Sequence, residues 1–222
     1  MKAIEWLQFF EVQRERHGKR IFTVTELANA ALASPGALNV QMARLLKRGL
    51  VVRYARGRYG PASGVSLEDL LPLVDSSAYA TGGYALYRHN LVTQVPFEIT
   101  CFTTRRHNRS RERRGPLGKL VFVCVGPRLY ARPAQGVIAP PEQALCDFLH
   151  LTARKSLAAE SLVTFRNLAR LRRRVLERLL ARYPQTVAQA ARRIAGPKMT
   201  AGRTLPQGSA QGPTSSRAGG SR

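Results

Sequence analysis

Cationic side chains are the residues of this sequence best suited to chemistry, and that chemistry is the binding of anions. Lys and Arg number 36 against 13 Asp and Glu, which gives a formal charge of +23 at pH 7 and an isoelectric point near 11.4. Such an excess repels itself unless an anion is close, and the usual partner is nucleic acid. A membrane surface is the alternative, but no apolar run approaches the roughly 20 residues of a spanning helix. We therefore expect a nucleic-acid partner and no membrane.

Residues of catalytic or metal chemistry occur singly rather than in sets. His107 and Asn108 have no carboxylate or thiol at a fixed spacing, so a structural role explains them better. Glu142 and Asp147 are five residues apart and do not share a helix face, so helix capping and solvent exposure explain them. No phosphate-binding loop, zinc-protease or metal-nuclease motif can be placed in the chain. We therefore expect no enzyme activity, no metal and no other cofactor.

The three cysteines indicate a reducing compartment. Cys101, Cys124 and Cys146 cannot all pair with one another, and their spacing matches no zinc site. Each of them lies in an apolar segment that has the character of a strand or a helix. The sequence therefore predicts buried, reduced thiols in a cytoplasmic protein.

Residues 34–61, SPGALNVQMARLLKRGLVVRYARGRYGP, contain the pattern that best positions basic side chains. Ser34 is a favoured N-cap residue, and Pro35 suits the first helical position because its missing N–H costs nothing there. Gly49 is placed to end the helix in a left-handed conformation. Residues 50–59 then predict a short β-hairpin with a glycine-containing turn at 55–57. The inward apolar stripe of the helix comprises Leu38, Met42, Leu45 and Leu46.

Polar and basic side chains occupy the opposite face of this helix and continue along the hairpin. A helix of this kind followed by a basic hairpin has the form of a winged helix-turn-helix, in which the helix enters a major groove and the hairpin contacts phosphates. The alternative is a solvated helix and hairpin of any small domain. The predicted DNA-binding residues are Ser34, Val40, Gln41, Arg44, Lys47, Arg48, Arg53, Arg56 and Arg58.

Two predicted helices precede residue 34, which makes the helix begun there the third, the position of a recognition helix. Thr23 and Glu26 fit a capping box that opens the second helix. The first helix spans residues 4–16, and its apolar positions are Ile4, Leu7, Phe10 and Val12. The chain is therefore predicted to be of α+β class, with a winged helix-turn-helix domain over residues 1–62.

A second, mixed α/β domain is predicted over residues 66–195. Ser66 caps its first helix, residues 79–89 form the next helix, and residues 97–103 and 117–125 form strands. A further helix begins at Pro140 or Pro141. Apolar residues at three- and four-residue steps then predict one basic amphipathic helix over residues 162–179 and a short last helix over 187–194. The Gly-, Pro- and Ser-rich tail, residues 196–222, is expected to be disordered because it has too few apolar residues to fold.

The densest charge run, RRHNRSRERR at residues 105–114, lies between the two predicted strands of this domain. It is therefore expected to be a hairpin loop or an exposed bend. A run that is almost entirely cationic usually contacts an anion, either the phosphate backbone of a nucleic acid or an acidic protein face. A solvated, partly disordered loop is the alternative. This candidate second anion-binding cluster comprises Arg105, Arg106, Arg109, Arg111, Arg113 and Arg114.

The order of these motifs resembles one known family. TVTELANAAL and the segment at 34–60 are followed by YATGGYALYRHNLVTQVP, a strand pair around a basic segment, and VIAPPEQALCDFL. The order is similar to that of the AbiEi-type antitoxins of type IV toxin–antitoxin systems. In that family a basic "RG-x-Y" resembles residues 56–59, a "Q-x-P" follows a helix like residues 84–92, and "P-E-x-A-L-x-D" resembles residues 141–147. The resemblance covers roughly residues 20–150.

The resemblance implies two linked roles for the chain. The winged helix would bind the operator of its own operon as a repressor, and the second domain would counter a nucleotidyltransferase-like toxin without a stable protein complex. Alternatives that remain open are a stand-alone regulator, or a general nucleic-acid-binding protein, for instance one associated with RNA or ribosomes. The sequence leaves the oligomeric state and the operator undetermined.

Overall fold

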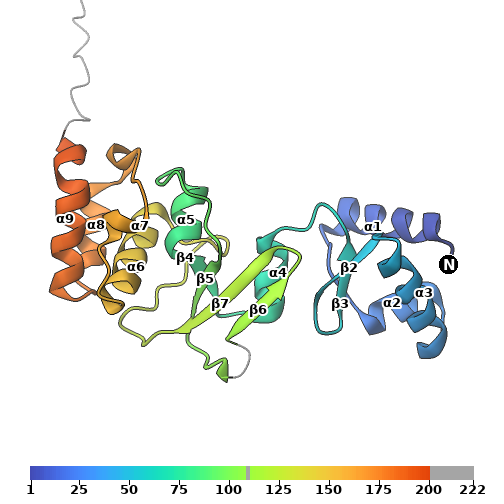
Figure 1. The fold of residues 1–222 in the computed structure, drawn as a ribbon. Helices are drawn as coiled ribbons and strands as arrows, with labels where there is room; N and C mark the ends of the chain where they lie inside the picture. The colour runs from blue at the N-terminus through green and yellow to red at the C-terminus, as the bar shows by residue number, and fades with distance from the viewer. Residues whose placement is uncertain (109–110, 201–222) are drawn as a thin grey trace, which may run out of the picture.

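A computed structural model describes residues 1–108 and 111–200 and has a mixed α+β fold, which confirms the predicted class (Figure 1). The N-terminal unit comprises α1 (Ala3–His17), β1 (Phe22–Thr23), α2 (Val24–Ala31), α3 (Pro35–Lys47), β2 (Val51–Ala55) and β3 (Arg58–Pro61). The second unit begins with α4 (Leu67–Val74), β4 (Tyr79–Thr81), α5 (Gly82–Arg88), β5 (Ile99–Thr103), β6 (Glu112–Gly115) and β7 (Gly118–Cys124). It ends with α6 (Pro141–Arg154), α7 (Ala159–Leu162), η2 (Leu168–Arg170), α8 (Arg173–Leu180) and α9 (Gln185–Thr200).

The capping signals of the N-terminal unit form as the sequence predicts. The Ser34 hydroxyl accepts a hydrogen bond from the Ala37 N–H at 3.4 Å, with Pro35 as the first residue of α3. Thr23 and Glu26 form the reciprocal capping box of α2. These bonds satisfy backbone donors that a helix start would otherwise leave unpaired, so they define where α2 and α3 begin.

The apolar stripe of α3 packs on an aromatic cluster from α1 and β1. Leu38, Met42 and Leu45 are buried there, whereas Leu46 is 37% exposed, so its predicted place in the stripe is wrong. Phe10 of α1 is buried as predicted, but Ile4, Leu7 and Val12 are exposed, and Trp6 is buried in their place. Large aromatic side chains bury more area than aliphatic ones, and Trp6 and Phe10 are four residues apart on one face.

A three-stranded antiparallel sheet closes the N-terminal unit, with strand order β1-β3-β2. β2 and β3 form the predicted hairpin, and Gly57 takes the left-handed conformation (φ +67°) that its tight turn requires. A side chain at Gly60 would collide with the carbonyl oxygen of Arg20, so the close approach of the two segments requires glycine. The hairpin thereby lies against the rest of the unit.

The sheet of the second unit has strand order β4-β5-β7-β6, with β5 and β7 parallel and the outer pairs antiparallel. One prediction is therefore wrong, and one of the two alternatives for the basic run is excluded. Residues 79–81 form β4 rather than the start of a helix, because they pair with β5 and are fully buried. The basic run is not a hairpin loop between β5 and β7, because parallel strands need a crossover. It passes from β5 to β6 at the far edge of the sheet.

The C-terminal helices gather at the end of the second unit opposite the N-terminal unit (Figure 1). The predicted continuous helix over residues 162–179 is wrong, because that stretch divides into α7, an extended segment, η2 and α8. Residue 165 bridges Val92, and the Arg166 N–H donates to the Leu91 carbonyl at 2.8 Å. These tertiary bonds compete successfully with helix formation, and Asn167 turns the chain in the left-handed conformation.

The predicted tail boundary is wrong at its start, because α9 continues to Thr200; the remainder, residues 201–222, lies outside the described residues. Within the described part of the chain, no helix combines the length and the apolar character needed to cross a bilayer. The two units contact each other through α4 and through the β6–β7 edge of the second sheet. Arg20 pairs with Asp69 at 3.1 Å, and Tyr54 packs in a cluster with Leu70 and Leu120.

Candidate functional site

The outer face of α3 carries four of the sequence-predicted binding residues. Val40, Arg44 and Lys47 follow one another at helical spacing, and Arg48 is the C-cap residue. All four side chains are exposed, and Val40 is 52% exposed although it is apolar. Because Leu38, Met42 and Leu45 hold the opposite face against the core, the orientation of the basic face is fixed by packing.

Two further predicted residues on α3 have structural partners. Gln41 is half-buried, and its Oε1 accepts a hydrogen bond from the Trp6 indole N–H at 3.2 Å. Its amide N–H₂ group is not used by that bond. The Ser34 hydroxyl serves as the helix cap described above. Gln41 and Ser34 therefore have structural roles that position α3. Arg44, Lys47 and Arg48 are available for a ligand.

The hairpin places three more arginines beside this helix. Arg53 and Arg56 are exposed and Arg58 is half-buried, with the Arg53 Nε–H donating to the Ala55 carbonyl at 3.4 Å. No ion pair within residues 1–108 and 111–200 involves a cation of α3 or of this hairpin. The resulting surface carries uncompensated positive charge, which attracts polyanions.

The basic run at 105–114 does not form one cluster. Arg106 and Arg111 line a hollow on the side of α6, whereas Arg114 borders the hairpin of the N-terminal unit. The Arg113 guanidinium lies 5.5 Å from the centre of the Phe122 ring. Arg105 is exposed, and Arg109 lies outside the described residues. A crossover followed by an edge strand turns successive side chains to different sides, which the sequence run did not reveal.

His107, which has no carboxylate at a fixed spacing in the sequence, contacts a buried carboxylate in the structure. Its Nε2 lies 2.7 Å from Oδ2 of Asp75, and its ring stacks on Phe122. Burial alone would raise the pKa of Asp75, but hydrogen bonds from Thr103, His107 and Ser77 outweigh it and hold that pKa well below its usual range. The sequence missed this pair because 32 residues separate its members.

Asp147 and Glu142, predicted to be solvent-exposed, are fully buried. Asp147 accepts hydrogen bonds from the hydroxyls of Thr81 and Tyr183, yet burial dominates and raises its pKa to about 7. Glu142 accepts bonds from the backbone N–H and the Nε–H of Arg172 at 2.8 and 3.1 Å. Burial opposes ionisation of Glu142, but the Arg172 contacts prevail and lower its pKa. Asp147 therefore links α6 to β4 and to the segment between α8 and α9, and Glu142 links α6 to the start of α8.

The thiols differ in accessibility. Cys101 and Cys146 are buried as predicted, and burial raises the pKa of Cys101 to about 12. Cys124 is exposed at the end of β7, so the prediction that it is buried is wrong. The residues that the structure describes contain no group of three His, Cys, Asp or Glu arranged to hold a metal ion. Cys124 is thus the thiol open to reagents.

No known protein-family model and no curated protein matches this chain. Function is accordingly inferred from the geometry and charge of the described residues. The feature with the strongest functional character is the exposed basic face of α3 together with the adjoining hairpin. The helix is supported by a packed core, and no described acidic side chain forms an ion pair with the cations of this surface.

Proposed function

We propose that this protein is a transcriptional repressor that binds double-stranded DNA through a winged helix-turn-helix over residues 1–62. The observation that carries the proposal is the division of α3 into a buried apolar stripe and an exposed face bearing Arg44, Lys47 and Arg48. The helix order and the sheet order β1-β3-β2 support it, because they place a basic hairpin next to the third helix.

In this proposal α3 enters the major groove and the hairpin follows the backbone. An arginine such as Arg44 can bond both acceptors of a guanine edge, and the methyl groups of Val40 can contact a thymine methyl. Arg53, Arg56 and Arg58 suit phosphates, which orient the protein without reading sequence. The N-terminus of α3, with its Ser34 cap, offers further backbone N–H groups to a phosphate.

The resemblance to AbiEi-type antitoxins adds a second half to the proposal. The repressor would bind the operator of its own operon, and the second unit would antagonise a nucleotidyltransferase-like toxin without a stable complex. A stand-alone regulator or a general nucleic-acid-binding protein without a toxin is the alternative. Sequencing the DNA that flanks the gene distinguishes an antitoxin from a stand-alone regulator, because only an antitoxin requires a neighbouring nucleotidyltransferase gene.

The double substitution Arg44→Ala plus Lys47→Ala tests the DNA-binding site. A base-contacting residue is worth about 1–3 kcal/mol, so operator affinity should fall roughly 30-fold or more. Gel-shift titration on the DNA upstream of the protein's own gene measures this, and circular dichroism confirms folding.

Arg170→Ala plus Arg174→Ala is the matched control, because both side chains are exposed in the second unit and the charge lost is equal. The control should bind the operator almost as the parent does. Equal affinity of the parent and the α3 variant would reject the site. Equal weakening by both double variants would indicate binding through net charge alone, as in a general nucleic-acid-binding protein.

A further inference from the structure

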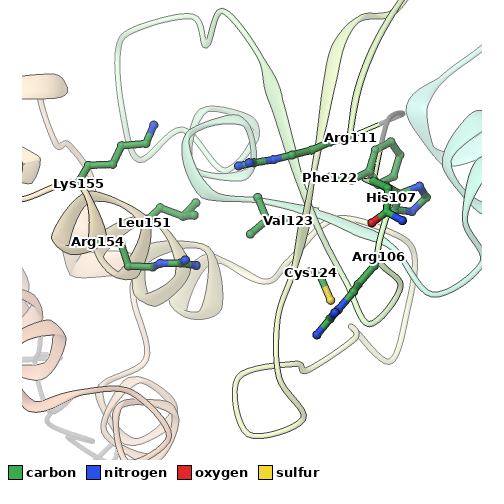
Figure 2. A pocket seen from close by; sticks show the side chains of 10 residues that line it. Arg106, His107, Arg111, Phe122, Val123, Cys124, Leu151, Arg154 and Lys155 are labelled. Carbon is green, nitrogen blue, oxygen red and sulfur yellow. The ribbon is translucent and has the colours of Figure 1, made fainter.

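A hollow of ≈ 420 Å³ lies between the carboxyl end of β7 and the last turn of α6 (Figure 2). Pockets for small molecules usually measure about 300–1,000 Å³, so the hollow can take a ligand of nucleotide size. Its walls come from three parts of the chain: the crossover after β5, the end of β7 and the end of α6. The hollow could not be predicted from the sequence, because about 50 residues separate the crossover from the end of α6.

Four cationic side chains border the hollow: Arg106, Arg111, Arg154 and Lys155. Figure 2 shows the Arg111 guanidinium extending toward the end of α6, while Arg154 points back toward Val123. Among the side chains that the structure describes, none of the four is in an ion pair, and no carboxylate lines the hollow. Like charges that line one hollow repel one another, and an anion between them removes that repulsion.

The helix end alone does not account for this arrangement. Arg154 and Lys155 interact favourably with the carbonyl end of α6, as cations at a helix C-terminus do. The helix end does not explain why Arg106 and Arg111, which come from the crossover segment, lie at the same hollow. Two sets of cations that converge from separate elements indicate a shared anionic ligand.

The crossover side of the hollow is held in place by buried contacts. His107 is bonded to Asp75, which also accepts from the Thr103 hydroxyl at 2.6 Å, and the His107 ring stacks on Phe122. The Phe122 N–H donates to the Arg111 carbonyl at 2.8 Å. These contacts anchor the residue after Arg106 and the carbonyl of Arg111 before a ligand arrives, which lowers the ordering cost of binding.

We propose that this hollow binds a nucleoside di- or triphosphate, with its phosphates between the four cations and its nucleoside on the apolar wall. One phosphate ester carries about −1.5 to −2 charge at pH 7, so two or three linked phosphates match four cations better than one. Val123 and Leu151 offer apolar surface beside the charges. The site is independent of the DNA-binding face of α3.

Calorimetric titration of the full-length protein with ATP and GTP tests the proposal, with adenosine, tripolyphosphate and duplex DNA as comparison ligands. Arg111→Gln plus Arg154→Gln should weaken nucleotide binding about tenfold or more, because charge-assisted hydrogen bonds to phosphate are lost. Arg170→Gln plus Arg174→Gln removes the same charge away from the hollow and should keep nucleotide affinity. The Arg44→Ala plus Lys47→Ala variant should also keep it, which distinguishes this site from the DNA-binding one.

Cys124 lines the hollow and provides a second readout. A saturating nucleoside triphosphate should slow its alkylation by N-ethylmaleimide, followed by mass spectrometry, while adenosine should not. No nucleotide binding at millimolar concentration, or equal binding by the hollow variant, would overturn the proposal. Protection of Cys124 by duplex DNA alone would instead assign the hollow to the nucleic-acid backbone. Equal affinity for tripolyphosphate and for ATP or GTP would show that the nucleoside does not contribute to binding, which would overturn that part of the proposal.

Discussion

The exposed face of α3 and the hollow beside α6 both carry cationic side chains, but the first surface is convex and the second is concave. Arg44 and Lys47 are exposed on α3, and α3 lies at one end of the molecule (Figure 1). Arg111 and Arg154 extend toward one another from opposite walls of a hollow (Figure 2). Identical side chains can thus be suited to different ligands, because the backbone beneath them decides whether their charges diverge or converge.

The two units also differ in what lies under these surfaces. Every buried polar or charged side chain that the structure describes belongs to the second unit, including Asp75, Glu142 and Asp147. The cluster beneath α3 consists of apolar and aromatic residues such as Trp6 and Leu38. Buried carboxylates make stability depend on pH, whereas an apolar core does not. The units should therefore respond differently to core truncation, to pH and to salt.

Truncation of the α3 stripe should have the largest effect. Leu38 is fully buried, and Leu38→Ala should lower the free energy of unfolding of the N-terminal unit by about 2–5 kcal/mol. Urea titration followed by the fluorescence of Trp6, the one tryptophan, reports this unit. Operator binding should weaken with it, while nucleotide binding by the hollow should persist.

Leu46→Ala is the control for that truncation, because Leu46 is partly exposed on the same helix. It should cost much less than Leu38→Ala. An equal cost for the two would mean that α3 packs differently, and loss of nucleotide binding in Leu38→Ala would mean that the units do not act separately.

The pH dependence of the second unit should have an intermediate effect. Burial raises the pKa of Asp147 to about 7, above its unfolded value of about 3.9, so its protonated form stabilises the fold. That stabilisation is complete below about pH 3.9 and is lost as the pH rises through about 7. The free energy of unfolding should fall by roughly 1–3 kcal/mol between pH 5 and 8, and Asp147→Asn should flatten this slope.

Unfolding followed by circular dichroism at several pH values measures that slope for the whole chain. Trp6 fluorescence is the internal control, because the unfolding transition that it reports should not shift in Asp147→Asn. Burial also lowers the pKa of His150, which gives a slope of the opposite sign, so the quantity to compare is the difference between parent and variant. Asp75 is ionised throughout this range and adds nothing to the slope. A parallel pH profile in Asp147→Asn would contradict the burial-dominated account.

The smallest effect should come from a single hairpin residue. Arg56→Ala should reduce the slope of log affinity against log salt by about 1 and weaken all DNA sequences alike, because a phosphate contact carries no sequence information. Gel shifts at several salt concentrations, on operator and unrelated DNA, measure both quantities. Arg170→Ala should leave the slope nearly unchanged, and a changed sequence preference in Arg56→Ala would place that residue on a base instead.

Local signals in the sequence were sufficient where a few neighbouring residues decide the structure. Ser34 with Pro35, Thr23 with Glu26, and the start of α6 at Pro141 each depend on bonds within one helical turn. The exposed basic face of α3 followed from its periodicity for the same reason. The resemblance to a family, and with it the antitoxin role, stays a prediction.

The sequence by itself determined the α+β class, the caps, the hairpin and the large positive charge. Only the tertiary structure decided that Asp147 is buried beneath Tyr183, that His107 contacts Asp75, and that Arg111 and Arg154 converge. The tertiary structure also divides the periodic stretch at 162–179 into separate elements. Pairing of residues 165 and 166 with the segment at 91–92 outweighs helix propensity there. Contacts between residues far apart in the chain leave no periodic trace in its sequence, since their geometry exists only after the sheet and the helices have packed.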